Sequence, residues 1–363
     1  MSNMQQVNKY IPDYLVTPGE VLEDYLEYAG ITQSALADRT GLSKRIINEI
    51  IKSKTAITAE IALKFERTLG RPAHFWSNLE QQYQEDKTRL ADKINLEKDL
   101  HCLDIFPVGE MVKLGWIEKF KEKSLQLDAL LRFFAVASPA QLPVCPQADF
   151  RITESYKTKK DAAIISAWLR KGEIDAKQKH CALFDRQKFK DSLVEIRKLT
   201  IIEEPKVFVP RLESICASCG VAVVFVPALT NLGIHGATRW IKDKYIMQLS
   251  LYLKSNDNLW FTVFHEAYHI INNSRKELYV EENTLENENE TENKANTFAC
   301  DILIPPKQLT GFLSSNYKPT LSQIERFAAD IGIAPGIVVG RLQHDRILSV
   351  KYGNNLKVRY HWT

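Results

Sequence analysis

The sequence HEAYH at residues 265–269 has the spacing of two histidines around a glutamate. Apolar residues surround it on almost every side, which predicts a buried helix over about 257–273. Side chains four residues apart share one face of a helix, so the imidazoles of His265 and His269 can bind one metal ion. Glu266 then lies beside the metal, where its carboxylate can take a proton from a bound water.

A third ligand is expected on the next helix, predicted over about 291–304. The inward face of this helix has helical spacing and consists of Ala295, Phe298, Ala299 and Ile302. Glu292 lies three residues before the first of these, on the same face. Two histidines, a carboxylate and a water form the open coordination of a catalytic zinc. We therefore predict one Zn²⁺ per chain on His265, His269 and Glu292, with Asn296 hydrogen-bonded to a ligand histidine.

The alternative for these histidines is that both are ordinary core residues satisfied by hydrogen bonds. They flank Glu266, however, and an unpaired buried carboxylate is costly in an apolar interior. A metal ion compensates for all three groups together, so the metal site is the preferred interpretation.

A second motif lies near the N-terminus, where two short helices are expected on either side of Gly41. Thr32 caps the first helix and Ser43 caps the second, which covers Lys44–Lys52. Two short helices joined by a glycine turn form a helix-turn-helix. We expect this motif to bind DNA through Gln33, Ser43, Lys44, Arg45, Asn48 and Lys52. A helical protein–protein module is the alternative.

Composition and charge restrict the class of protein. The 363 residues carry a net charge of +3, which gives no general basic field for nucleic acid. The six cysteines have no framework spacing and are expected to be reduced, and the CxxC pair Cys216 and Cys219 is interpreted as packing. We see neither a signal peptide nor a run of apolar residues long enough to span a membrane, so a cytoplasmic location is expected.

The fold class is predicted to be mainly α with a small α+β domain that resembles the zincins and has about three strands. The strands are expected at Val221–Val226, Gly236–Ile241 and Tyr245–Leu251, the last as an edge that would pair with an extended peptide. The acidic stretch Lys276–Asn293 is interpreted as an exposed loop. Four domains are expected: a DNA-binding block over 1–85, a helical linker, dimerisation or sensing region over 86–205, a peptidase domain over 206–310, and a helical extension over 311–363.

About 70 N-terminal residues resemble the HigA-type antitoxins of the XRE helix-turn-helix family. The matching features are Pro18-Gly19-Glu20, the Ser34–Arg39 helix, Leu42-Ser43, the Ile57–Ala62 helix start and Ala73–Trp76 with Asn78-Leu79. The resemblance implies a homodimer that reads a palindromic operator, with half-sites about one helical turn apart. It also implies a toxin as partner.

The C-terminal half resembles the ImmA/IrrE family of metallopeptidases. The resemblance rests on HEAYH and on ENKANTFACDILIP, and the preceding GATRWIKDKYIMQLSL also fits. Segments such as FPVGEMVKLGWI and IAPGIVVGRLQ are similar to a long subfamily in which a HigA-like domain is fused to this domain. Two departures are Tyr268, where the family usually has glycine, and Ile271-Asn272-Asn273, where a further histidine is common.

Together these resemblances imply a DNA-binding regulator with a zinc endopeptidase that cleaves a repressor or antitoxin, in trans or within its own chain. The candidates for stabilising an oxyanion are His235, Tyr245 and Tyr268. The alternative is an antitoxin and autorepressor that binds a toxin and uses a catalytically silent zinc domain as sensor or scaffold. A peptidase needs a fragment that depends on Glu266, whereas a binding protein needs only a stable complex.

Overall fold

The chain forms two compact units. The computed structural model describes residues 15–143, 158–230, 233–250, 254–272, 279–280, 288–315 and 318–360. The N-terminal unit comprises residues 1–100 with 121–127, and the C-terminal unit comprises residues 101–120 with 128–363. Each unit has its own apolar core. The mainly α fold class with a small sheet is confirmed.

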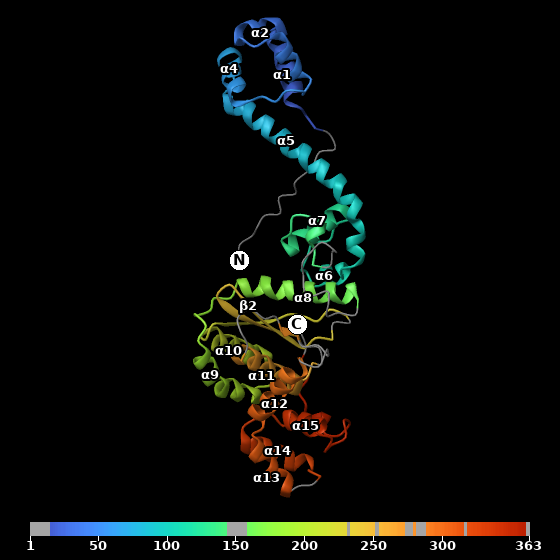
Figure 1. Cartoon of the computed structure of the whole chain (residues 1–363), viewed down its shortest axis with the longest axis vertical. Helices are drawn as coiled ribbons and strands as arrows, with labels where there is room; N and C mark the ends of the chain where they lie inside the picture. The colour runs from blue at the N-terminus through green and yellow to red at the C-terminus, as the bar shows by residue number, and fades with distance from the viewer. Residues whose placement is uncertain are drawn as a thin grey trace. The chain divides into compact units, whose positions relative to one another are not determined.

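The N-terminal unit begins with a bundle of short helices (Figure 1). They are α1 Pro18–Ala29, α2 Gln33–Thr40, α3 Lys44–Ile51, α4 Ala59–Leu69 and the longer α5 Ala73–Leu96. The side chains of Thr32, Ser43 and Thr58 accept backbone N–H groups at the starts of α2, α3 and α4, which satisfies donors that each helix leaves unpaired. The apolar faces meet around Leu22, Leu36, Ile47, Phe65 and Trp76, each fully buried.

Helix α5 runs past residue 85, where a domain boundary was expected. The segment from Ala73 to Leu96 contains neither glycine nor proline, and the pair Glu85–Arg89 supports its exposed face. Further along the chain come η1 Glu97–Asp104, α6 Val108–Lys113, α7 Lys123–Phe134 and η2 Pro139–Gln141.

The C-terminal unit is built on a small mixed sheet with strand order β1-β3-β2-β4. The strands are β1 Val221–Phe225, β2 Gly236–Ile241, β3 Lys244–Leu249 and β4 Tyr279–Val280. β3 pairs in parallel with β1 and antiparallel with β2. The prediction of an edge strand over Tyr245–Leu251 is therefore wrong, because both sides of β3 are paired. β2 pairs on its other side with β4, at Ala237 and Thr238.

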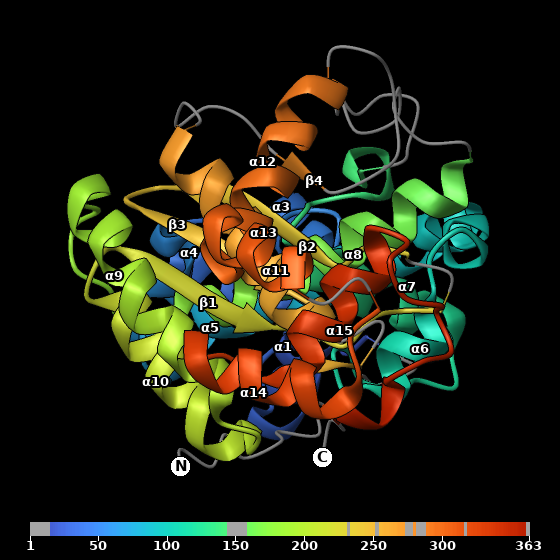
Figure 2. The same cartoon turned by 90° about the horizontal axis from the view of Figure 1, so that it is seen from below.

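Helices cover both faces of this sheet (Figures 1 and 2). On one face lies α8 Lys159–Lys177, where a Cβ at Gly172 would overlap the side chain of Gln248 on β3. This close approach explains why glycine occupies that position. The other face carries α9 Arg186–Lys198, α10 Pro205–Ala217 and α11 Asn256–Asn272. Thus α8 and α9, from the segment expected as a linker, lie in the same compact unit as the sheet.

The remaining helices are α12 Glu288–Leu303, α13 Pro306–Ser315, α14 Leu321–Ile331 and α15 Pro335–His344, followed by η5 Asn354–Leu356. α12 and α15 pack on α11, and α14 packs on α15. α12 begins at Glu288, so the last part of the acidic stretch is helical and not a loop. Glutamates are favourable in a first helical turn because they face its partial positive charge. The guanidinium of Arg197 donates to the carbonyl oxygens of Ile302, Leu303 and Ile331, which ties α9 to the ends of α12 and α14.

Two smaller expectations concern cysteines and membranes. Cys216 and Cys219 are buried in the core of the C-terminal unit, in agreement with the packing interpretation. Cys102, Cys181 and Cys300 form no disulfide within the described residues, and Cys145 lies outside them. In the part of the chain that the structure describes, every helix is too short or too polar to cross a membrane.

Candidate metal centre and DNA-binding helix

The two histidines of the HEAYH sequence face the same point from consecutive turns of α11. His265 and His269 are each 1% exposed, and their Nε2 atoms lie 3.1 Å apart. The helix is buried on nearly all sides, between the sheet, α9, α12 and α15. Packing therefore fixes the direction of both imidazole rings.

Glu292 reaches this point from α12. Its Oε2 lies 3.0 Å from His265 Nε2, and its Oε1 lies 3.3 Å from His269 Nε2. These three residues form a group whose donor atoms all lie within 4.8 Å of one another. Glu292 is half-buried, with its side chain 23% exposed, so the group is closed by protein on the histidine side and reachable from the glutamate side.

The donor set fits a zinc ion. Two ligands about 2.0–2.1 Å from a tetrahedral zinc lie about 3.3 Å apart, close to the distances observed here. Burial by itself raises the pKa of the Glu292 carboxyl, but the adjacent imidazoles of His265 and His269 outweigh it and hold the pKa at about 2. The carboxylate is therefore in the ionised form that binds a metal.

Asn296 orients the first histidine. Its Oδ1 lies 2.9 Å from His265 Nδ1, one helical turn beyond Glu292. Because an amide oxygen only accepts, this contact places the proton on Nδ1 and leaves the Nε2 lone pair directed at the group of ligand atoms.

Glu266 is held against the sheet. It is 1% exposed, and Thr238 Oγ1 on β2 donates to its Oε2 at 2.5 Å. A Cβ at Gly236 would lie 2.6 Å from Glu266 Oε1, so only glycine leaves room for this carboxylate. Sequence reasoning missed Thr238 and Gly236, because their importance comes from the packing of β2 on α11.

The three candidates for an oxyanion partner lie in different places. Tyr245 pairs with Trp240 on β2, four residues from the position that pairs with Gly236, and is buried against Phe184. At about 3.3 Å per residue it is some 13 Å along the strand from Glu266, too far for this role. Tyr268 packs on Phe298, with the ring centroids 5.5 Å apart. His235 immediately precedes Gly236 and is half-buried.

The residues expected to contact DNA are all exposed in the N-terminal unit. They are Gln33, Ser43, Lys44, Arg45, Asn48 and Lys52. Arg45 is 85% exposed along its side chain and forms an ion pair with Glu49 at 2.8 Å. The hydroxyl of Ser43 caps α3 and is thereby engaged with the backbone N–H of Ile46. The buried face of α3, Ile47, Ile50 and Ile51, fixes which side of the helix remains free.

Fold and site together define a helix-turn-helix protein joined to a domain of metallopeptidase type. Comparison with protein families agrees: residues 22–76 match the helix-turn-helix family, and residues 220–342 match the IrrE N-terminal-like domain. The chain therefore carries an XRE-type helix-turn-helix domain in its N-terminal part and an IrrE/ImmA-like domain in its C-terminal part.

Individual relatives match the N-terminal part. Virulence-associated protein I of Dichelobacter nodosus is 33% identical over 96 residues, which are 25% of this chain and 89% of that protein. Antitoxin HigA-1 of Vibrio cholerae serotype O1 is 35% identical over 66 residues, 18% of this chain and 62% of HigA-1, which is less than two thirds of its length. The solved structure of Pseudomonas aeruginosa antitoxin HigA with higBA promoter is 28% identical, covers 23% of this chain and 94% of its own, and has a TM-score of 0.22.

Proposed function

We propose that the protein is a sequence-specific DNA-binding regulator that carries a zinc-dependent endopeptidase. The observation that carries the peptidase is the buried group of His265, His269 and Glu292, with donor atoms 3.0–3.3 Å apart and Glu266 next to it. Glu266 is not one of the proposed metal ligands, so we interpret its buried carboxylate as the proton acceptor of the reaction.

A zinc ion on these three side chains would act as a Lewis acid on a scissile carbonyl and lower the pKa of the attacking water. Glu266 takes the proton of that water and returns it to the leaving amine. Thr238 donates a hydrogen bond to Oε2 and so holds the carboxylate in place. Asn296 keeps His265 in the tautomer whose Nε2 binds metal.

DNA binding is assigned to the exposed side of α3. Lys44 and Lys52 suit phosphate contacts, Arg45 suits guanine, and Asn48 suits adenine. We further propose that the protein binds a palindromic operator as a homodimer, with one α3 helix in each half-site. A protein of this kind acts in the cytoplasm.

The proposed substrate is a repressor or antitoxin, in trans or within the same chain. Cleavage between the DNA-binding domain and the rest would relieve repression. The test is the Glu266→Gln variant, incubated with zinc beside the parent protein and followed by intact-mass spectrometry for self-cleavage and on a quenched peptide library. We expect fragments from the parent and none from the variant, with zinc content equal in both.

The control for this test is Glu290→Gln, which changes an exposed glutamate on α12, two residues before Glu292. Glu290 is paired only with Lys294 among the described contacts, so this variant should cleave like the parent. Equal cleavage by Glu266→Gln and the parent would show that the mechanism is wrong.

A second candidate function is favoured by the relatives, one of which is named an antitoxin. In this case the protein is an autorepressor that binds a toxin, and the zinc domain is a silent sensor or scaffold. It predicts a stable complex with a toxin whose affinity is the same for Glu266→Gln and the parent, and no fragment from either.

A further inference from the structure

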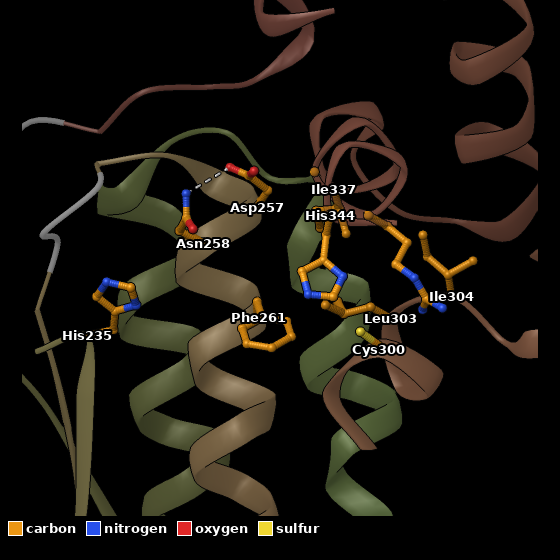
Figure 3. A pocket seen from close by; sticks show the side chains of 11 residues that line it. His235, Asp257, Asn258, Phe261, Cys300, Leu303, Ile304, Ile337 and His344 are labelled. Carbon is orange, nitrogen blue, oxygen red and sulfur yellow. Dashed lines mark hydrogen bonds between the residues drawn. The ribbon is translucent and has the colours of Figure 1, made fainter. Parts of the chain in front are cut away.

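A pocket of about 240 Å³ lies among α11, α12 and α15 (Figure 3). α11 and α12, which supply the metal ligands, also supply its near wall. Phe261 lies one turn before His265, with the ring centroids 6.1 Å apart, and Cys300 lies one turn after Asn296. His235, next to the glycine that touches Glu266, lines it too. The pocket lining therefore lies one turn of α11 from His265 and two turns of α12 from Glu292.

Size and lining define what this pocket can hold. An engineered cavity of about 150 Å³ holds benzene, so the volume here suits one large side chain and not an extended ligand. The wall is formed largely by Phe261, Leu303, Ile304 and Ile337. In Figure 3, Phe261 is central, with His235 on one side and Leu303 and Cys300 on the other.

The charged groups around the pocket are already compensated. Asp257 accepts from Lys357 at 2.7 Å, and Arg341 Nε donates to Asp345 at 2.7 Å. Arg341 Nη1 is buried and makes no hydrogen bond within the described residues, which leaves one guanidinium donor unpaired at this wall. A basic side chain would bring only further donors to it, whereas an apolar side chain buries its surface against the apolar wall.

We propose that this pocket is the specificity pocket of the peptidase, and that it takes a bulky apolar side chain beside the scissile bond. The inference rests on the proposed function, since it assigns the substrate class of the same metal centre. Leucine, methionine and phenylalanine fit the volume and the wall, and lysine and arginine are disfavoured by Arg341.

The test uses hydroxamates, which bind zinc directly and place one side chain next to it. N-acetyl hydroxamates of glycine, leucine, phenylalanine and lysine are titrated by calorimetry into the zinc-loaded full chain. The leucine and phenylalanine compounds should bind about ten- to a hundredfold tighter than the glycine compound, as burial of such a side chain predicts. The lysine compound should show no gain.

Two variants test whether the preference for apolar hydroxamates arises in this pocket. Cys300→Leu fills the pocket from its wall and should remove the preference for the leucine and phenylalanine compounds over the glycine compound. Thr297→Leu, an exposed change one turn away on α12, should keep the preference.

The binding results distinguish a wrong pocket assignment from a wrong metal centre. If the glycine and leucine compounds bind equally well, the metal centre stands and the pocket assignment is overturned. If the preference survives in Cys300→Leu, the side chain binds elsewhere and the assignment is again overturned. If no hydroxamate binds, the metal centre itself fails, and the pocket proposal fails with it.

Discussion

The contact between Asn296 and His265 allows a quantitative prediction for metal affinity. Asn296→Ala removes the acceptor that lies 2.9 Å from His265 Nδ1. His265 is 1% exposed, so its ring N–H would lose its partner where water replaces it poorly. An unsatisfied buried donor costs about 1–3 kcal/mol. Loss of such a supporting contact lowers metal affinity by about 10–100-fold, or about 1.4–2.8 kcal/mol, which agrees with that cost.

The assay is zinc affinity measured by competition with a chelating dye. Asn296→Asp keeps an oxygen acceptor and should retain the parent affinity or exceed it. Asn293→Ala is the matched control, because Asn293 is exposed on the same α12 helix and should leave the affinity unchanged. If Asn296→Ala binds zinc as tightly as the parent, then the contact does not orient His265 and the reasoning is refuted.

Three further predictions concern other parts of the chain. Asn48→Ala should weaken binding to a site selected from random DNA by about 1–3 kcal/mol and relax the preference at one base pair; an unchanged preference in a repeated selection would argue against base contact. Gly19→Ala should destabilise the N-terminal unit by about 1–3 kcal/mol, because a Cβ would overlap the carbonyl oxygens of Ile50 and Ile51 on α3. Urea unfolding measures this loss, and a free energy of unfolding equal to the parent's would contradict the close packing. Burial raises the pKa of the Cys216 thiol, so iodoacetamide at pH 8 should label Cys216 only after unfolding, as peptide mapping would show; rapid labelling of the folded protein is the contrary result.

Much of the candidate site was open to prediction because it depends on helix periodicity. The spacing of His265 and His269 places them on one face whatever surrounds the helix. The position of Glu292 relative to Ala295 likewise selects it from seven glutamates in the acidic stretch. Asn296 follows from the same period, one turn further on.

The contacts that sequence reasoning missed join elements far apart in the chain. Thr238 is 28 residues from Glu266, and the hydrogen bond between them depends on how β2 packs on α11. Strand order is equally non-local. β3 lies inside the sheet because the crossover after β1 brings these two strands together in parallel, and no local pattern in Tyr245–Leu251 indicates this.

Two helix ends also differ from what the local sequence pattern predicts. The polarity of the segment before α12 indicated a loop, yet the helix begins at Glu288, and Glu290 lies in its first turn, where negative charge is stabilising. The end of α5 had no glycine or proline to mark it, so the expected boundary at residue 85 falls within a continuous helix.

The most direct test of the account is the zinc content of the purified protein by plasma mass spectrometry. The parent should hold about one zinc per chain, His265→Ala and Glu292→Ala should hold none, and the exposed Glu290→Ala should keep it. Absence of metal from the parent, or full retention in Glu292→Ala, would contradict the three-ligand site and leave the antitoxin and autorepressor function as the better explanation.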